Sequence, residues 1–171
     1  MDLFLLRHAI AEPAAESGAG ADRERRLTPE GEEKMREIAE GMKVCELEFD
    51  LILSSPYARA KQTADIVAEV LQCKKRLELS PNLVPNGSPQ KLIDELNSNY
   101  ADKESILLAS HEPYLSGLLS LLISGDAGIA INFKKGGLGK LTVDRLRHGR
   151  CATLEWLLTP RQLRGLGQRK G

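Results

Sequence analysis

The sequence predicts an α/β fold, a three-layer α/β/α sandwich whose central sheet is mainly parallel but mixed. Two observations lead to this prediction: short apolar runs alternate with segments of helical periodicity, and a Ser/Thr-Pro pair recurs before those segments. A chain of 171 residues can bury a core without disulfides or metals. We therefore expect residues 1–171 to form a single domain.

Three short apolar runs are each followed by a segment of helical periodicity, which is typical of buried parallel strands. These runs are residues 3–6, 51–53 and 106–109. Further strands are predicted at residues 129–133, 138–143 and 152–158. The turn-rich residues 144–149 suggest a hairpin between the last two strands, so the sheet is expected to be mixed.

Four helices are predicted to start at Ser/Thr-Pro pairs. The hydroxyl can accept from the unpaired N–H groups of a first turn, and proline at the first helical position loses no hydrogen bond. The pairs are Thr28-Pro29, Ser55-Pro56, Ser88-Pro89 and Thr159-Pro160. A further helix, without such a pair, is predicted from the stripe Leu115, Leu118, Leu119 and Leu122.

Composition excludes several classes of function. The 24 basic residues balance the 24 acidic ones, so nothing suggests general attraction to nucleic acid or to a membrane surface. The basic tail (Arg161, Arg164, Arg169 and Lys170) is interpreted as a solvated terminus rather than a binding patch. Three scattered cysteines favour a reducing compartment, and no segment resembles a signal peptide or a membrane span. We expect a cytoplasmic protein.

Candidate chemical groups follow three of the predicted strands. Arg7 and His8 end the first run, Arg59 lies in the first turn of the helix after the second, and His111 follows the third. The carboxyl ends of parallel strands meet at one edge of a sheet, where ligands bind. Arginine matches phosphate geometry, and neutral imidazole is a nucleophile near pH 7. The pattern predicts a pocket for a tetrahedral dianion.

Three motifs in register resemble the histidine phosphatase superfamily, which includes the cofactor-dependent phosphoglycerate mutases. They are residues 7–9 (RHA), 55–64 (SPYARAKQTA) and 110–113 (SHEP). Residues 25–31 (RRLTPEG) are similar to an element of its small SixA-type phosphohistidine phosphatase branch. The chain departs from the superfamily pattern at Ala9, where glycine is usual, and at Glu112, where asparagine is frequent. The resemblance covers about residues 1–158 and implies a phosphoglycerate mutase-like fold.

The resemblance implies that His8 attacks phosphorus and forms a phosphohistidine intermediate that water hydrolyses. Arg7, Arg59 and His111 would then bind and stabilise the phosphoryl oxygens. Arg25 is a further candidate phosphate ligand, although Arg23 and Arg26 compete for that role. Glu12 and Glu112 are candidate proton donors. No metal or other cofactor is predicted, because the basic groups already neutralise a dianion and no carboxylate cluster suits magnesium.

The expected substrate is a protein that carries phosphohistidine, such as a phosphotransfer domain of a signalling or sugar-transport relay. Between Thr63 and Ser105 the chain has room for a helix, a short strand and another helix, but not for an extended lid with a general acid. Imidazole leaves more readily than an alkoxide and needs that acid less. Two alternatives stay open: a general small-molecule phosphomonoesterase, and a non-catalytic phosphoprotein-binding module. A monomer is favoured.

Overall fold

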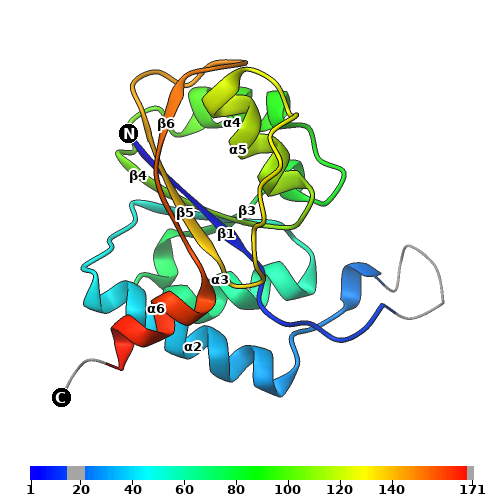
Figure 1. Cartoon of the computed structure of the whole chain (residues 1–171), viewed down its shortest axis with the longest axis vertical. Helices are drawn as coiled ribbons and strands as arrows, with labels where there is room; N and C mark the ends of the chain where they lie inside the picture. The colour runs from blue at the N-terminus through cyan, green and yellow to red at the C-terminus, as the bar shows by residue number, and fades with distance from the viewer. Residues whose placement is uncertain (15–21, 169–171) are drawn as a thin grey trace.

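A six-stranded sheet forms the centre of the computed structural model, which describes residues 1–14 and 22–168 (Figure 1). The strands are β1 (Asp2–Arg7), β2 (Leu51–Ser54), β3 (Leu77–Leu79), β4 (Ser105–Ser110), β5 (Leu138–Val143) and β6 (Ala152–Leu158). Their order is β3-β2-β4-β1-β5-β6. The first four run parallel, whereas β5 is antiparallel to both β1 and β6. The predicted mixed sheet is confirmed.

Helices cover both faces of this sheet (Figure 1). One face carries α4 (Pro89–Asn99) and α5 (Tyr114–Ser124); the other carries α2 (Pro29–Val44), α3 (Ala58–Val70) and α6 (Pro160–Gly167). Central strand β1 contributes to both cores: Leu3 and Leu5 pack with α4 and α5, and Phe4 and Leu6 pack with the other helices. Burial on both faces explains why this strand is an unbroken apolar run.

The Ser/Thr-Pro pairs cap three of the four predicted helix starts. Thr28, Ser88 and Thr159 each accept a hydrogen bond from a backbone N–H of the first helical turn, at 3.0–3.3 Å. Ser55 does not cap α3. That helix begins at Ala58, after Tyr57, which makes no side-chain cap. The expectation for Ser55 was wrong because α3 begins three residues later: the Ser55 hydroxyl accepts from the N–H of Tyr57, before the helix, and lies 2.8 Å from a histidine ring at the sheet edge.

The predicted strand at residues 129–133 is also wrong, because this segment is irregular in the structure. Strand β1, beside which it ends, is already paired with β4 on one side and β5 on the other, so no ladder position is available there. Phe133 is nevertheless buried in the core under α5. The apolar character of the segment therefore reflects this anchoring rather than sheet pairing.

Two short 3₁₀ turns, Lys74–Arg76 and Pro81–Leu83, flank β3.

The first turn of α2 contains a glycine, Gly31, because the backbone of another segment passes too close for a side chain. The loop after β1 crosses this turn so closely that a Cβ on Gly31 would lie 2.0 Å from the carbonyl oxygen of Ile10. The same carbonyl accepts from the N–H of Thr28 at 3.0 Å, so it cannot move without breaking the cap. Residues 25–31 thus fasten the start of α2 to the loop that carries the first motif.

Gly31→Ala is expected to lower the free energy of unfolding by about 2 kcal/mol or more, measured by urea denaturation, because the methyl group must displace backbone. Gly117→Ala is the matched control. Gly117 lies inside α5 with no atom near its would-be Cβ, so alanine there should stabilise by about 0.5–1 kcal/mol. Equal effects of the two changes would contradict the close approach at Gly31.

Candidate active site

The carboxyl ends of β1, β2 and β4 bring three motif segments together at one edge of the sheet. The loops that leave these strands are linked by backbone hydrogen bonds: His8 N–H donates to Ser110 at 3.0 Å, and Ser55 N–H donates to Ala109 at 2.9 Å. Arg59 joins them from the first turn of α3. The predicted convergence of Arg7, His8, Arg59 and His111 is thus present in the structure.

His8 is almost fully buried, and its hydrogen bonds define its tautomer. The Nδ1–H group donates to the carbonyl of its neighbour Ala9 at 2.7 Å. Arg59 Nε donates to Nε2 of the same ring at 3.3 Å, so Nε2 carries the lone pair. A side-chain hydroxyl fixes the loop itself, because Thr63 Oγ1 accepts from Ala9 N–H at 3.1 Å. This arrangement presents an oriented nucleophilic nitrogen next to a guanidinium.

His111 lies beside His8, with ring centroids 5.2 Å apart. Its Nε2 is 2.8 Å from Ser55 Oγ, and the same oxygen accepts from the N–H of Tyr57, the residue before α3, at 3.3 Å. Its Nδ1 is buried and has no hydrogen-bond partner in the described part of the chain. The edge of the Tyr57 ring faces His111 at 5.3 Å, and the Arg59 guanidinium lies 5.3 Å from the centre of that same ring.

Asp22 holds the outer side of the Arg59 guanidinium. Its backbone carbonyl accepts from Arg59 at 2.6 Å, and its carboxylate accepts at 3.1 Å. The same carboxylate accepts from Arg25 at 2.7 Å, while Arg25 Nε donates to the backbone carbonyl of Glu12 at 2.9 Å. Arg25 therefore reaches the site through Asp22, and its role as a direct phosphate ligand stays a prediction.

Arg7 is fixed from the side of the sheet that carries β5. Its guanidinium donates to the carbonyl of Phe133 at 2.6 Å, and its Nε is a buried nitrogen with no partner among residues 1–14 and 22–168. Burial lowers the pKa of Arg7, and the nearby Glu112 carboxylate opposes this effect. An arginine stays charged in proteins, so Arg7 offers a fixed positive charge.

The two candidate proton donors differ in their surroundings. Glu12 is exposed, and its backbone contacts residues 25–31. Its N–H donates to the Arg26 carbonyl at 2.9 Å, and its carbonyl accepts from Arg25 Nε. Glu112 is half-buried and accepts from Ser116 N–H at 3.0 Å in the first turn of α5. Of the two, Glu112 is thus the one whose charge is felt at Arg7. A proton-donor role for either residue stays a prediction.

Both site histidines are neutral at pH 7. Burial, together with the charges of Arg59, Arg7 and Lys135, lowers the pKa of His8 to about 3 against the hydrogen bond to Ala9. Burial, the neighbouring His8 ring and the charge of Arg59 lower the pKa of His111 to about 3 as well. A neutral imidazole is the form that can attack phosphorus. Four basic side chains at one spot therefore include only two positive charges, both on arginine.

These lowered pKa values predict acid sensitivity. Below pH 6.5 the unfolded chain binds a proton at each of these histidines, whereas in the folded protein both rings stay neutral down to about pH 3, so stability falls as the pH falls through this window. The two groups together should cost about 3 kcal/mol of unfolding free energy between pH 6.5 and 5.

The measurement is urea denaturation as a function of pH on the wild type and on a His8→Asn, His111→Asn double variant. The double variant should lose most of the dependence over this window. His148→Asn, at an exposed histidine, should retain it. A double variant with undiminished pH dependence would contradict the burial of two neutral rings.

Several site residues were missed by sequence reasoning. Ser55 and Tyr57 lie within a motif that was quoted, but they were not assigned to the site. Asp22 has no motif neighbour, and its position three residues before Arg25 was the only available signal. Gln62, also in the second motif, accepts from Leu27 N–H at 2.8 Å and so connects α3 to residues 25–31, the segment that contains Arg25. Residues of the second motif on both sides of Arg59 therefore contact the site or the segment that contains Arg25.

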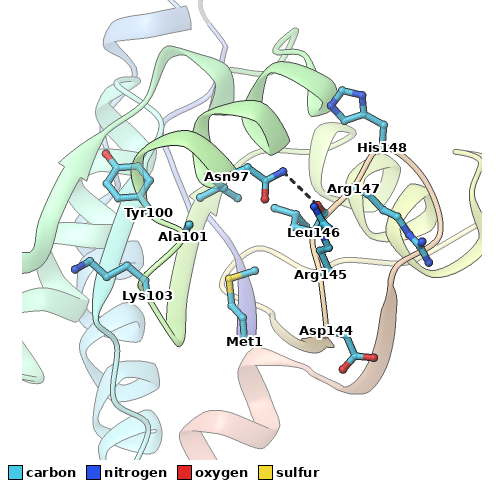
Figure 2. A pocket seen from close by; sticks show the side chains of 11 residues that line it. Met1, Asn97, Tyr100, Ala101, Lys103, Asp144, Arg145, Leu146, Arg147 and His148 are labelled. Carbon is cyan, nitrogen blue, oxygen red and sulfur yellow. Dashed lines mark hydrogen bonds between the residues drawn. The ribbon is translucent and has the colours of Figure 1, made fainter.

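His148 lies far from this site, as expected for a hairpin residue. A cavity of about 750 Å³ at the opposite edge of the sheet is lined by the start of β1, the end of α4 and the β5–β6 hairpin (Figure 2). His148 Nε2 is 2.7 Å from the Asp94 carboxylate there, and Asn97 donates to the Leu146 carbonyl at 3.2 Å. The predicted hairpin is confirmed, and this cavity contains none of the motif residues.

No group of three or more His, Cys, Asp or Glu side chains that could hold a metal ion occurs at residues 1–14 or 22–168. None of the helices described is long and apolar enough to cross a bilayer.

Comparison with known proteins connects this geometry to a family. A family model described as histidine phosphatase superfamily (branch 1) matches residues 3–84. An uncharacterized protein of Picosynechococcus sp. is 31% identical over 139 residues, covering 81% of this chain and 82% of the relative. Phosphohistidine phosphatase SixA of Escherichia coli is 28% identical over 165 residues, covering 96% and 97%.

A solved structure of the protein histidine phosphatase SixA complexed with tungstate superposes with a TM-score of 0.82 at 29% identity, covering 95% of this chain and 99% of that one. Its fold agrees with the expectation from the sequence. These homologues support a phosphatase. On the matched model, the 31% identical relative and the shared fold, the chain belongs to the histidine phosphatase superfamily and is of the SixA type.

Proposed function

We propose that this protein hydrolyses phosphohistidine on a partner protein through a covalent phospho-His8 intermediate. The single observation that carries the proposal is the state of His8: a buried, neutral ring whose Nε2 lone pair is oriented by the Nδ1–H bond to Ala9 and faces Arg59. The name of the Escherichia coli relative, phosphohistidine phosphatase SixA, favours the same chemistry.

In the first step His8 Nε2 attacks phosphorus, and the phosphorus–nitrogen bond of the substrate breaks. If the substrate ring is protonated, it leaves as neutral imidazole and needs no further proton from the enzyme. In the second step water attacks phospho-His8, which releases inorganic phosphate and returns a neutral ring with its lone pair on Nε2. Charge on the transferred group is stabilised by fixed donors rather than by new bonds.

Arg7, Arg59 and His111 supply these donors. Two buried nitrogens, Arg7 Nε and His111 Nδ1, have no partner in the described part of the protein, and phosphoryl oxygens would satisfy them. Arg59 is occupied differently, because Asp22 holds its outer nitrogens. A bound phosphoryl dianion therefore competes with a carboxylate for one guanidinium.

A phosphohistidine substrate fits the surroundings of the two glutamates better than a phosphate ester does. An alkoxide leaving group requires a proton donor, but Glu12 is exposed and Glu112 is engaged with the first turn of α5. Metal independence and a cytoplasmic location, expected from the sequence, belong to this proposal.

The deciding experiment compares kcat/KM on a histidine-phosphorylated phosphotransfer domain with kcat/KM on p-nitrophenyl phosphate and phosphoserine. The phosphohistidine protein should be favoured by about 100-fold or more, which corresponds to nearly 3 kcal/mol. Activity should persist in EDTA. Faster turnover of the esters would favour a general phosphomonoesterase, and binding without turnover of any substrate would favour a recognition module.

A further inference from the structure

A groove adjoins Arg7 and the candidate active site on the side of α2 and α6. It is a cavity of about 630 Å³ that begins at Arg7 and Ala9 and continues between the start of α6 and the side of α2. Its apolar lining includes Ile10 and Pro160, which are half-buried, and Ile38, which is almost fully buried. In Figure 1 the elements that form it, the end of β1, the segment leading into β5, α2 and α6, meet at the lower part of the molecule.

Cations surround this groove, and several of them lack a counterion. Lys34 and Arg164 also line it, but they pair with Glu30 and Glu37 of α2. Its other basic residues besides Arg7 are Lys134, Lys135 and Arg161. No carboxylate of the described chain lies within ion-pair distance of these three exposed side chains. The chain as a whole has no net charge, so this positive charge is a local concentration.

The lysine pair is fastened to the catalytic strand. Gly136 N–H donates to the carbonyls of Arg7 and His8 at 3.0 and 3.2 Å, and Arg7 N–H donates to Gly137 at 3.1 Å. Gly136 has a φ of +77°, which favours glycine, and a Cβ added there would lie 2.8 Å from Ile38 Cδ1 and 3.7 Å from Pro160 Cγ. Lys135 immediately precedes this turn, and its charge is one of those that depress the pKa of His8.

We propose that this groove, defined by Ile10, Ile38, Pro160, Lys134, Lys135 and Arg161, docks an acidic, partly aliphatic segment of the phosphoprotein next to its phosphohistidine. The inference rests on the proposed function, since it names the kind of protein surface that presents the substrate to His8. Charge complementarity supports it: unpaired cations from two separate elements face the groove, and an apolar floor between them suits aliphatic side chains. The groove is continuous with the catalytic site through Arg7.

The structure changes the interpretation of Arg161 from a residue of a solvated tail to a residue that lines the groove. The sequence favoured a solvated basic terminus, but α6 places this residue on the groove. Arg164 lines the same groove while paired with Glu37. The other two basic residues of the tail, Arg169 and Lys170, lie outside the described residues.

The binding test uses three synthetic peptides that carry phosphoryltriazolylalanine, a non-hydrolysable phosphohistidine analogue, flanked by Glu and Leu, by Lys and Leu, or by Ser and Leu. Calorimetry on the wild type should give a Kd about tenfold or more lower for the acidic peptide than for the serine peptide, with the lysine peptide weakest. A Lys134→Glu, Arg161→Glu double variant should lose or reverse this order. Equal affinities of the wild type for the three peptides would overturn the proposal.

A matched control carries the same charge change elsewhere. Arg145→Glu, Arg147→Glu alters two basic residues of the cavity at the opposite edge of the sheet (Figure 2) and should leave the peptide order unchanged. If this control abolishes the preference for the acidic peptide to the same extent, the effect is general electrostatics and the groove is not the docking site. Preferential loss of binding to anionic vesicles or RNA in the Lys134→Glu, Arg161→Glu variant, with the acidic peptide unaffected, would also overturn the proposal.

Kinetics separates this inference from the proposed function. On free phosphohistidine, which has no flanking segment, Lys134→Glu, Arg161→Glu should change kcat/KM by less than twofold, while on an acidic phosphotransfer domain kcat/KM should fall tenfold or more, mainly through KM. A wild type that hydrolyses both substrates, together with a variant that retains full activity on the domain, contradicts the groove alone. A wild type that hydrolyses neither contradicts the proposed function.

Discussion

Replacing His8 by asparagine is expected to reduce kcat on a phosphohistidine protein by about 10³-fold or more, because the variant has no ring nitrogen to accept the phosphoryl group. Asparagine retains a polar group at the position that now donates to Ala9, so the loop should remain folded. Inorganic phosphate should still bind, since Arg7, Arg59 and His111 are intact.

Rapid quench with ³²P-labelled phosphoprotein measures this prediction directly. The wild type should accumulate acid-labile, alkali-stable phosphate on a peptide containing His8, and the asparagine variant should show none. His148→Asn, at an exposed histidine paired with Asp94, is the control and should behave as wild type. Label on a different residue, or unchanged release of phosphate by His8→Asn, would assign the nucleophile elsewhere.

Arg59→Ala is expected to lower kcat/KM by about 10²- to 10³-fold. Its guanidinium is the only group described that touches His8 Nε2, and it also carries one of the two arginine charges of the site. Its loss removes a donor to the phosphoryl group and leaves the Asp22 carboxylate near the site without this counterion. Steady-state kinetics and phosphate binding by calorimetry should both show the loss.

Two further variants separate these contributions. Adding Asp22→Asn to Arg59→Ala should recover about fivefold in kcat/KM, because a carboxylate that repels the dianion is gone. Arg36→Ala removes an exposed arginine of α2 that pairs with Glu69 on α3, and it should have little effect. If Arg36→Ala is as damaging as Arg59→Ala, the loss reflects general charge or stability rather than the position of one guanidinium at His8.

The fold could be predicted to a large extent because its signals are local. Runs buried on both faces, such as residues 3–6, read as apolar blocks whatever their neighbours, and the hydroxyl caps at Thr28, Ser88 and Thr159 act within one helical turn. The segment 129–133 has the same composition as a strand, but a ladder requires a vacant strand edge, which depends on the order of the whole sheet.

The site divides along the same line. The proximity of Arg7, His8, Arg59 and His111 could be predicted because each occupies a strand end or a first helical turn, where parallel topology brings ends together. Ser55 was assigned to a helix cap because its neighbour is proline, whereas a histidine 56 residues away competes for its hydroxyl. A local signal cannot reveal such competition.

The sequence by itself determined the alternation of strands and helices and the three motifs that bring phosphoryl chemistry to one sheet edge. Only the tertiary structure decided the protonation state of His8 and the partners of Arg59. Three contacts join residues far apart in the chain: the Arg59 donor to His8 Nε2, the Asp22 carboxylate on Arg59, and the hydrogen bonds of Gly136, next to Lys135, to the Arg7 and His8 carbonyls. Burial and electrostatic interaction depend on distance in space, and so the lowered pKa that keeps the His8 ring neutral is a property of the folded site.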